Sequence, residues 1–372
     1  MNLSFSVMAL IKDIYSVSFY QTIADEFQRV DSSFNKQLFI KRIFDADFTN
    51  MEWKQRMKHS TSVLHESLPG HFPTAASLIC QVIQHLIDHG VSGGLEYAIF
   101  PDYIESYGLN DFDTAIRSFE VITKFISCEF AVRPFIIRYH SRMIAEMEKW
   151  SRDTHPQLRR LASEGSRPRL PWAMAIPFLK KDPTPLLPIL ENLKDDLAET
   201  VRRSVANNLN DISKDHPDFV LGIARRWKDY SIHTNGIIKH GCRTLLKQGN
   251  PEILHFYGLK SSDFTVSQLT IQTPIVKIGE HVVFSFRIEN KSGQSRLLRL
   301  EYAVYYKKLN AQLSKKVFKI SERTYAAAEI NSILRRQSFK QITTRKFHLG
   351  KHKLSIIVNG REMGEIDFEL VP

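Results

Sequence analysis

Up to about Tyr257 the hydrophobic positions of the chain recur with the roughly 3.6-residue period of an amphipathic helix. One apolar helix face is formed by Leu186, Leu190, Leu193 and Leu197. The next helix has a face with the same kind of spacing, formed by Val201, Val205, Leu209 and Ile212. Asp215 and Pro217 then supply an N-cap and a first-turn proline for a further helix. This part of the chain is therefore predicted to be helical.

The predicted helices recur along this part of the chain at intervals of roughly 40 residues. Two segments start alike, with an aliphatic residue and two arginines: Leu158-Arg159-Arg160 and Val201-Arg202-Arg203. Residues 237–247 supply another short basic helix at the same interval. Helix pairs with this period are typical of HEAT-like repeats, in which each pair buries its apolar face against its neighbours. Residues 1–260 are therefore predicted to form an α-solenoid of HEAT-like helical repeats.

Beyond Ser262 the hydrophobic period changes to two, as in β-strands. Phe284, Phe286 and Ile288, for example, alternate with polar residues, and Asn359-Gly360 is a strong hairpin signal. About seven short strands in residues 263–372 indicate an immunoglobulin-like β-sandwich without a disulfide. The fold class expected is thus multidomain, α then β, with a boundary near residue 260.

The composition is that of an ordinary soluble globular protein, with 372 residues of which 43% are hydrophobic and 24% charged. Three widely separated cysteines favour a reducing compartment and argue against a structural zinc site. The first ten residues lack the charged start of a signal peptide, and no run is long enough to span a membrane. We therefore expect a cytoplasmic protein without a membrane partner; a monomeric state is also expected.

The net charge of +11 is concentrated in two regions. Residues 263–372 contain 19 Lys/Arg against 10 Asp/Glu, and residues 133–181 contain 11 against 4. Such regions fit a nucleic acid backbone, where basic side chains displace condensed counterions. A well-solvated basic surface is the alternative, and for the C-terminal region alone the two interpretations are equally supported.

Glu129 is predicted to lie at the edge of a helical apolar stripe. That stripe consists of Val121, Phe125, Cys128 and Val132. Partial desolvation raises the pKa of a carboxyl group unless a cation lies near it, and Arg133, four residues on, could be that cation. The residues alone therefore favour an ordinary Glu129–Arg133 helix pair over a functional site.

Asp211 belongs to a polar helix stripe whose other members are Ser204, Asn207 and Asn208. A stripe of this kind can be a solvated helix face. Amides and a carboxylate without neighbouring Lys or Glu are more typical of a concave surface that faces a ligand. The nearby Asp215 is interpreted as an N-cap rather than as a site residue.

Glu164 is expected at the end of a helix, before a proline-containing segment that runs to Trp172. That segment also carries Arg167 and Arg169. It can be a rigid connection with its tryptophan in the core, as is usual for this residue type. Alternatively, an acid and an aromatic plane meet there and form a receptor for a flat cation. Phosphate loops, the common hydrolase motifs and metal-ligand clusters are absent from the sequence, so no metal or cofactor is expected.

Three segments together resemble the AlkC branch of the AlkC/AlkD alkylpurine DNA glycosylases. They are residues 129–135 (EFAVRPF), 163–172 (SEGSRPRLPW) and 201–217 (VRRSVANNLNDISKDHP). The resemblance extends along most of the chain from about Met8. It includes residues 315–319 (KKVFK), 343–345 (TTR) and 350–352 (GKH), which resemble the immunoglobulin-like domain of some AlkC proteins.

This resemblance implies a DNA repair enzyme built from HEAT-like repeats. Such an enzyme hydrolyses the N-glycosidic bond of N3-alkylated bases in duplex DNA, chiefly 3-methyladenine and as a further candidate 3-methylcytosine, and leaves an abasic site. The resemblance places the catalytic acids on Glu129, Glu164 and Asp211, and the aromatic contact to base or sugar on Trp172. We expect Asp211 and Glu164 to matter most and Glu129 to support them. Since no lysine stands out as a Schiff-base nucleophile, a monofunctional enzyme is expected.

The partner expected is double-stranded DNA that contains alkylated bases. The residues expected to contact it are Arg159, Arg160, Arg167, Arg169, Arg202, Arg203, Lys315, Lys316, Arg345 and Lys351. For the paired arginines of the repeats, helix packing is the alternative role. A non-catalytic HEAT-repeat protein that binds distorted DNA is the main competing hypothesis, and a scaffold for acidic peptides is a third. A glycosylase assay separates these three classes.

Overall fold

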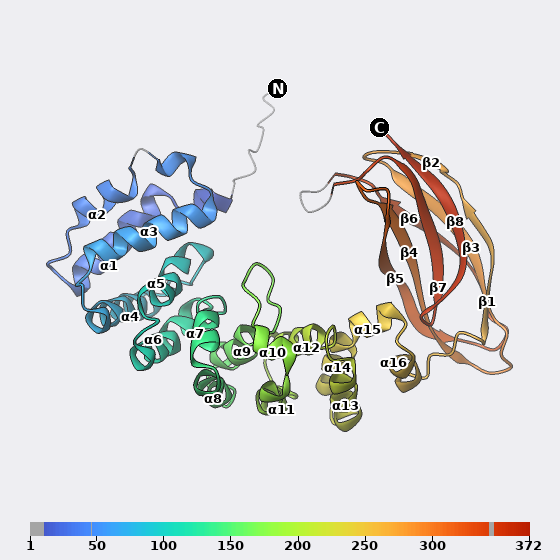
Figure 1. The fold of residues 1–372 in the computed structure, drawn as a ribbon, viewed down its shortest axis with the longest axis horizontal. Helices are drawn as coiled ribbons and strands as arrows, with labels where there is room; N and C mark the ends of the chain where they lie inside the picture. Colours follow the sequence, from blue (N-terminus) through green and yellow to red (C-terminus); the bar gives the residue numbers. More distant parts are fainter. Residues whose placement is uncertain (1–10, 46, 342–345) are drawn as a thin grey trace. The chain divides into compact units, whose positions relative to one another are not determined.

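The computed structural model describes residues 11–45, 47–341 and 346–372 (Figure 1). Within these residues the chain forms sixteen α-helices followed by eight β-strands, so the predicted order of helical region and β region is confirmed. No helix in the described part is long and apolar enough to span a bilayer. The arrangement of the helices as HEAT-like repeats stays a prediction.

The first eight helices are α1 (Val17–Val30), α2 (Lys36–Ile43), α3 (Trp53–Ser67), α4 (Phe72–Asp88), α5 (Ile99–Tyr107), α6 (Phe112–Phe125), α7 (Val132–Tyr139) and α8 (Ser141–Trp150). The second eight are α9 (Pro156–Gly165), α10 (Pro177–Lys181), α11 (Leu187–Leu193), α12 (Glu199–Ile212), α13 (Pro217–Trp227), α14 (Ile232–Gly241), α15 (Arg243–Gln248) and α16 (Pro251–Phe256). Four short 3₁₀ turns lie between them: η1 (Ile11–Ile14), η2 (Phe48–Asn50), η3 (Leu95–Ala98) and η4 (Thr184–Leu186).

The strands are β1 (Phe264–Ile271), β2 (Ile275–Lys277), β3 (His281–Asn290), β4 (Arg296–Lys307), β5 (Leu313–Tyr325), β6 (Ile330–Ser338), β7 (Gly350–Val358) and β8 (Arg361–Val371). Contacts divide the chain into two compact units. The first holds the residues up to His216 together with Trp227–Gly241, and the second holds Pro217–Arg226 and Cys242–Pro372. The change from helix to strand falls between Phe256 and Phe264, and a domain boundary at residue 260 stays a prediction.

In the first unit, α12 packs between α9 and α14. Glycine permits the close approach of α14 to α12 and of α9 to α7. A Cβ atom at Gly241 would lie 2.9 Å from the Cβ of Leu209, and one at Gly165 would lie 2.6 Å from Cγ2 of Val132. The C-terminal ends of α9 and α12 are thereby fixed against their neighbours, and these ends carry Glu164 and Asp211.

Several predicted helix boundaries were wrong. Residues 121–132 do not form one helix, because α6 ends at Phe125 with Ile126 extended and α7 begins only at Val132. Leu197 is 92% exposed and lies beyond the end of α11, so it is no part of an apolar face. Residues 237–247 are divided between α14 and α15. Hydrophobic spacing alone did not reveal these breaks, since extended and turn residues can keep the same apolar positions.

The start of α13 was predicted in part. Pro217 does lie in its first turn, but His216 occupies the N-cap position. Asp215 instead forms an ion pair with Arg169, at 2.7 Å between the Arg169 Nη2 and Asp215 Oδ1 atoms. The carboxylate that was interpreted as a cap is therefore held by a cation from the α9–α10 segment.

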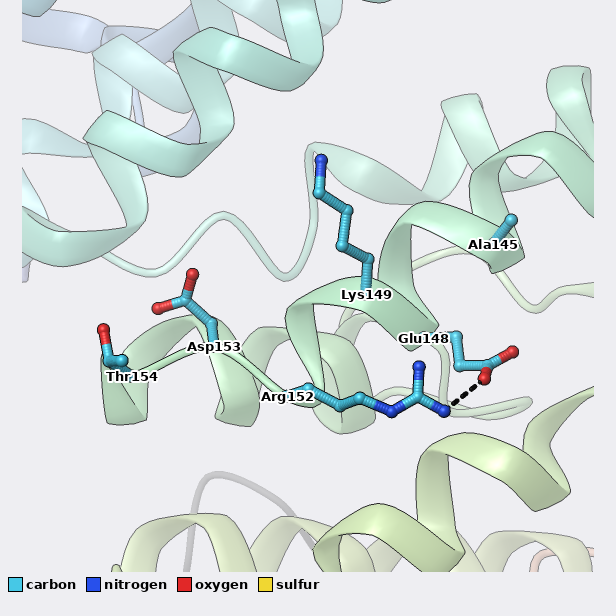
Figure 2. Close-up of a pocket in the computed structure, with 6 residues that line it drawn as sticks. All are labelled: Ala145, Glu148, Lys149, Arg152, Asp153 and Thr154. Carbon is cyan, nitrogen blue, oxygen red and sulfur yellow. Dashed lines mark hydrogen bonds and ion pairs between the residues drawn. The ribbon is translucent and has the colours of Figure 1, made fainter.

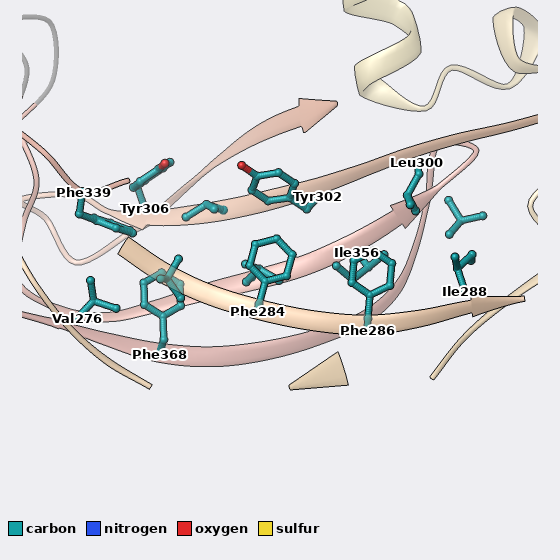
Figure 3. Packing of buried hydrophobic residues seen from close by; sticks show 14 of the residues in the cluster. Val276, Phe284, Phe286, Ile288, Leu300, Tyr302, Tyr306, Phe339, Ile356 and Phe368 are labelled. Atoms are coloured by element: carbon teal, nitrogen blue, oxygen red, sulfur yellow. The ribbon is translucent and has the colours of Figure 1, made fainter. Parts of the chain in front are cut away.

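The strands form a three-stranded sheet in the order β1-β3-β6 and a five-stranded sheet in the order β2-β8-β7-β4-β5. Pairing is antiparallel except between β2 and β8. Alternate side chains of both sheets form one hydrophobic core, in which Phe284 and Phe286 of β3 lie among Tyr302, Ile356 and Phe368 of the other sheet (Figure 3). The structure has eight strands in its described residues where about seven were expected.

The turn between β7 and β8 has the two-residue form that Asn359-Gly360 predicted. Both residues have positive φ, 45° and 79°, as the tight hairpin turn requires. The Asn359 side chain donates to the Lys260 carbonyl at 2.8 Å, and a Cβ at Gly249 would lie 2.6 Å from the Gly360 carbonyl oxygen. This turn therefore packs directly against the last helices of the second unit.

Candidate functional site

Two of the three predicted acids meet on one guanidinium group. Glu164 lies in the last turn of α9 and Asp211 in the last turn of α12. Arg167 donates from Nη1 to Oε1 of Glu164 at 2.5 Å and from Nε to Oδ2 of Asp211 at 2.7 Å. Its Nη2 atom also lies 2.7 Å from Oδ2 of Asp211. Arg167 thus joins the ends of two helices whose acids are far apart in sequence.

This cluster is almost completely removed from solvent. The exposed fractions are 6% for Glu164, 7% for Arg167 and 2% for Asp211. Burial by itself would lower the pKa of Arg167, but the charges of Glu164 and Asp211 and the hydrogen bonds to them raise it above its ordinary value. The guanidinium therefore stays charged and provides both carboxylates with a fixed counter-charge.

The second oxygen of Asp211 has a different partner. Lys214 follows the end of α12 and donates from Nζ to Oδ1 of Asp211 at 2.8 Å. Its side chain is 39% exposed, while that of Arg167 is 8% exposed. Asp211 is therefore held on one side by a buried cation and on the other by a cation at the surface.

Arg133 lies beneath this cluster and is fully buried. Its Nη1 atom donates to the carbonyls of Gly165 and Arg167, at 2.9 and 2.8 Å, and its Nε atom donates to that of Met174 at 2.7 Å. Burial, with a further contribution from the charge of Arg167, lowers the pKa of Arg133 to about 10. Arg133 remains charged at neutral pH and ties the end of α9 to the loop that follows it.

That loop presents Trp172 to solvent. Its side chain is 84% exposed, so the expectation of a tryptophan in the core does not hold. Its φ angle is 65°, a conformation that is uncommon for a bulky residue. The hydrogen bonds that hold the loop include those from Arg133 to the Met174 carbonyl, from Ile176 to the Pro168 carbonyl and from Lys54 to the Trp172 carbonyl. An exposed indole on a tethered loop suits a ligand contact better than a packing role.

Glu129 lies in the turn between α6 and α7 rather than on a helix. Its partner is not Arg133 but Arg160 of α9, with 2.7 Å between the Arg160 Nη2 and Glu129 Oε2 atoms. Ser127 donates to the same carboxylate at 2.8 Å and accepts from Arg160 at 2.9 Å. Since Arg160 and Glu164 are one turn apart on α9, Glu129 lies along the same face of that helix as Glu164.

The polar stripe of α12 turns inward. Ser204 and Asn208 are 2% and 0% exposed, and Asn208 donates to the Ser163 carbonyl of α9 at 2.9 Å. Asn208 therefore holds α12 against α9, and the prediction that the stripe faces a ligand was wrong for both buried residues. The acid of the stripe, Asp211, reaches the cluster around Arg167.

Among the arginines expected at DNA, Arg159 binds the Asp196 carboxylate through two hydrogen bonds of 2.6 and 3.1 Å. Arg202 donates to two carbonyl groups in the loop before α12, those of Asp196 and Leu197. Arg203 and Arg169 lie nearer the surface, paired with Glu199 and Asp215. The first two side chains thus hold helix ends together, which is the packing role that was left open for them.

In the β region, Lys315 pairs with Glu362 at 2.5 Å and Lys316 lies over the ring of Phe318. Lys351 is exposed at the start of β7. Arg345 lies outside the described residues.

A separate surface pocket of about 620 Å³ lies at the end of α8 (Figure 2). Its lining includes Lys149 and Asp153, and Arg152, which pairs there with Glu148 at 2.7 Å. None of the predicted acids lines this pocket. The described residues contain no group of three or more His, Cys, Asp or Glu side chains placed to hold a metal ion.

Sequence reasoning missed the roles of Arg133 and Lys214. Arg133 was considered only as a helical partner of Glu129, and nothing in the local pattern signals that it binds three distant carbonyls. For Lys214 a signal did exist, since it follows Asp211 at the i, i+3 spacing that brings side chains together on a helix.

Known proteins match almost the full length of the chain. The chain is 41% identical to the uncharacterized protein YhaZ of Bacillus subtilis, in an alignment that covers 98% of this chain and all of that protein. The Pseudomonas fluorescens alkylpurine DNA glycosylase AlkC, solved with DNA that contains an abasic site analog, is 34% identical and superposes with a TM-score of 0.91. That match covers 98% of this chain and 100% of the AlkC chain. The chain belongs to the AlkC family.

The family assignment includes the C-terminal region. Residues 265–372 match the model of the C-terminal Ig-like domain described for the uncharacterised protein YhaZ. The resemblance that three motifs indicated is therefore confirmed, as is the immunoglobulin-like nature of the β region. Glu129, Glu164, Asp211 and Trp172 remain the candidate site residues of this AlkC-family member.

Proposed function

We propose that the chain is a DNA glycosylase that hydrolyses the N-glycosidic bond of cationic N3-alkylated bases in duplex DNA. Its principal substrate is 3-methyladenine, with 3-methylcytosine a further candidate, and its product is an abasic site. The observation that carries the proposal is the pair of buried carboxylates, Glu164 and Asp211, held on Arg167 beside the exposed Trp172 loop. The AlkC relative acts in the same class, as an alkylpurine DNA glycosylase bound to abasic-site DNA.

The chemistry needs no proton donor. A 3-methylated purine is already cationic, so the bond between C1′ and the base breaks with its electron pair moving to the base nitrogen, and a neutral base leaves. Positive charge then develops on the deoxyribose, where preorganised carboxylates stabilise it. Water attacks C1′ and gives up a proton to a carboxylate, as in the hydrolysis of glycosides.

In this mechanism Asp211 and Glu164 face the developing cation, Glu129 adds to the negative field, and the Trp172 ring contacts base or sugar. The enzyme is monofunctional, so reduction with borohydride should trap no covalent adduct between a lysine and DNA. The helical region is a solenoid of HEAT-like repeats, and the protein acts as a monomer. Arg160, Arg169 and Arg203 and the lysines of the sandwich are the proposed DNA contacts, while Arg159 and Arg202 serve packing. Arg167, also expected at DNA, is buried on Glu164 and Asp211 and instead holds these two acids in place.

The direct test measures release of 3-methyladenine from alkylated duplex DNA. Asp211→Asn and Glu164→Gln should each lower the single-turnover rate by about 100-fold or more, since each removes a charge that acts on the transition state. Glu199→Gln is the control, because Glu199 is an exposed acid of the same helix α12. Wild-type rates in both carboxamide variants would refute these roles. Binding without any base release would favour the competing hypothesis of a non-catalytic DNA-binding protein.

A further inference from the structure

We propose that Lys214 is a resident counter-ion of Asp211 that a cationic ligand must displace. It would thereby set how strongly the site prefers cationic over neutral ligands. This inference rests on the proposed function, because it assumes that Asp211 faces the positive charge of the substrate. It concerns a residue that none of the predicted roles includes.

The two oxygens of Asp211 differ in their partners. Oδ2 is held by both Nε and Nη2 of Arg167, each at 2.7 Å. Oδ1 is bound by Lys214 at 2.8 Å. The Arg167 side chain is 8% exposed and also binds Glu164, so it has little freedom to leave. Oδ1 is therefore the oxygen that an incoming cation can reach, and Lys214 occupies its position.

The side chain of Lys214 is suited to being displaced from the Asp211 carboxylate. This side chain is 39% exposed, and an ammonium on a flexible four-carbon stem is readily solvated. The Asp211 side chain is only 3% exposed, so its carboxylate needs a cation at all times, and the ammonium leaves only when an incoming cation takes its place. The residue also follows the C-terminus of α12, where the negative end of the helix dipole favours a nearby cation whether or not that cation contacts Asp211.

The presence of this lysine has a consequence for DNA binding. Without it, Oδ1 of Asp211 would have no cation of its own, and its negative charge would repel an approaching phosphate backbone. With it, that charge is balanced until a positively charged lesion or sugar takes the place of the ammonium. A neutral base cannot make this exchange, because it offers no charge to replace that of Lys214.

The test compares two matched DNA duplexes that differ at one position. One carries a pyrrolidine abasic-site analogue, a secondary amine that is protonated at neutral pH, and the other carries the neutral tetrahydrofuran analogue. Dissociation constants are measured at one salt concentration for the full-length wild type, Lys214→Gln, Lys214→Arg and Asp211→Asn. Lys194→Gln is the control, since Lys194 also pairs with an acid at i, i+3 spacing, at 3.2 Å from Glu191.

The preference is defined as the dissociation constant for the neutral duplex divided by that for the cationic duplex. Lys214→Gln should raise this preference roughly threefold to tenfold, the effect of one charged hydrogen bond in a partly exposed site. Lys214→Arg should lower it below the wild-type value, because a guanidinium can grip the carboxylate with two donors. Lys194→Gln should leave it unchanged.

The inference is overturned if Lys214→Gln weakens both duplexes equally. That outcome would make Lys214 a phosphate contact, and repeating the titrations over a series of salt concentrations would then show a slope of log K against log salt that is smaller in magnitude by about 0.9. If Asp211→Asn abolishes the preference while Lys214→Gln leaves it at the wild-type value, only the role of Lys214 fails. If the wild type has no preference and Asp211→Asn changes nothing, the proposed function of Asp211 fails, and the inference with it.

Discussion

At the scale of single residues, the candidate site depends on cations that hold other groups in place. Arg133 is the clearest case, with three of its hydrogen bonds ending on carbonyls of one segment, those of Gly165, Arg167 and Met174. The carbonyls of Gly165 and Arg167 lie between Glu164 and Trp172 in the sequence, and that of Met174 follows Trp172. A planar guanidinium can serve several acceptors at once, which an ammonium cannot do in the same fixed geometry.

Replacement of Arg133 by lysine should therefore lower the free energy of unfolding by about 2 kcal/mol, because it keeps the charge but leaves buried carbonyls without a donor. Thermal denaturation of the full-length protein measures this change. Arg138→Lys is the matched control, since Arg138 lies on the same helix α7 but is exposed. Equal melting temperatures for the two variants would show that the three hydrogen bonds do not stabilise the fold.

A second residue-scale prediction concerns His352, which is 1% exposed in the sandwich core among Phe339, Phe368 and Tyr306. Burial lowers the pKa of His352 below 6.5, and the charges of Lys307 and His348 lower it further. The hydrogen bond to the Gly350 carbonyl opposes this shift by raising the pKa. Since the unfolded state binds a proton more readily, the free energy of unfolding should fall as the pH drops below 6.5 and level off below the folded-state pKa.

Calorimetry of the full-length protein between pH 7.5 and 5.5 checks this expectation. His352→Phe retains a ring in the aromatic cluster and removes the titrating group, so the sandwich transition of this variant should depend less on pH than that of the wild type. An identical pH dependence in both proteins would assign the effect to another group.

At the scale of elements, the loop after α9 combines exposure with constraint. Hydrogen bonds hold it at the Trp172, Met174 and Ile176 backbone, yet the indole of Trp172 remains 84% exposed. A left-handed conformation at a bulky residue costs free energy, and the fold maintains it without burying the side chain. This combination is typical of a functional position.

Trp172→Ala should therefore change the free energy of unfolding by no more than ~0.5 kcal/mol, as for other exposed positions. Base release should fall strongly in the same variant, because the aromatic contact to the substrate is lost. Trp53→Ala, which changes a tryptophan of helix α3 outside this loop, is the comparison for both the free energy of unfolding and base release. A large loss of stability in Trp172→Ala would assign the indole a structural role instead.

At the scale of the whole molecule, the uneven distribution of charge along the chain has a consequence that can be measured, namely the salt dependence of DNA binding. The excess of basic residues in 263–372 includes Lys316 and Lys351, both exposed in the structure. Truncation at residue 263 would be a poor test, because the last helices of the second unit pack against the β7–β8 turn through Asn359 and Gly360. Single side chains are the better target.

The double variant Lys316→Gln, Lys351→Gln should bind DNA more weakly, and its slope of log K against log salt should be smaller by about 0.9 for each lost phosphate contact. The control is Lys36→Gln, a change of one surface lysine of α2 that pairs with Asp25. An unchanged slope in the double variant would mean that these lysines only solvate the sandwich surface.

Much of the architecture was predictable from the sequence. Hydrophobic periods of about 3.6 and two residues separate the helical region from the β region, because side-chain direction follows backbone period. Asn359-Gly360 predicted its turn, since few residue pairs tolerate two positive φ angles. Motifs around Glu129, Glu164 and Asp211 indicated the family that the comparisons confirmed.

What the sequence did not determine is which charges meet. The pairs of Arg167 with Asp211, Arg160 with Ser127 and Arg133 with Met174 join residues 44, 33 and 41 positions apart, where no local periodicity applies. The sequence did not reveal exposure either, since the polar Asn208 is fully buried and the large aromatic Trp172 is 84% exposed, the reverse of what their residue types suggest. Tertiary packing, such as that of α9 against α12 beside Arg167 and Asp211, brings these groups together, because burial and ion pairing depend on distances in space rather than along the chain.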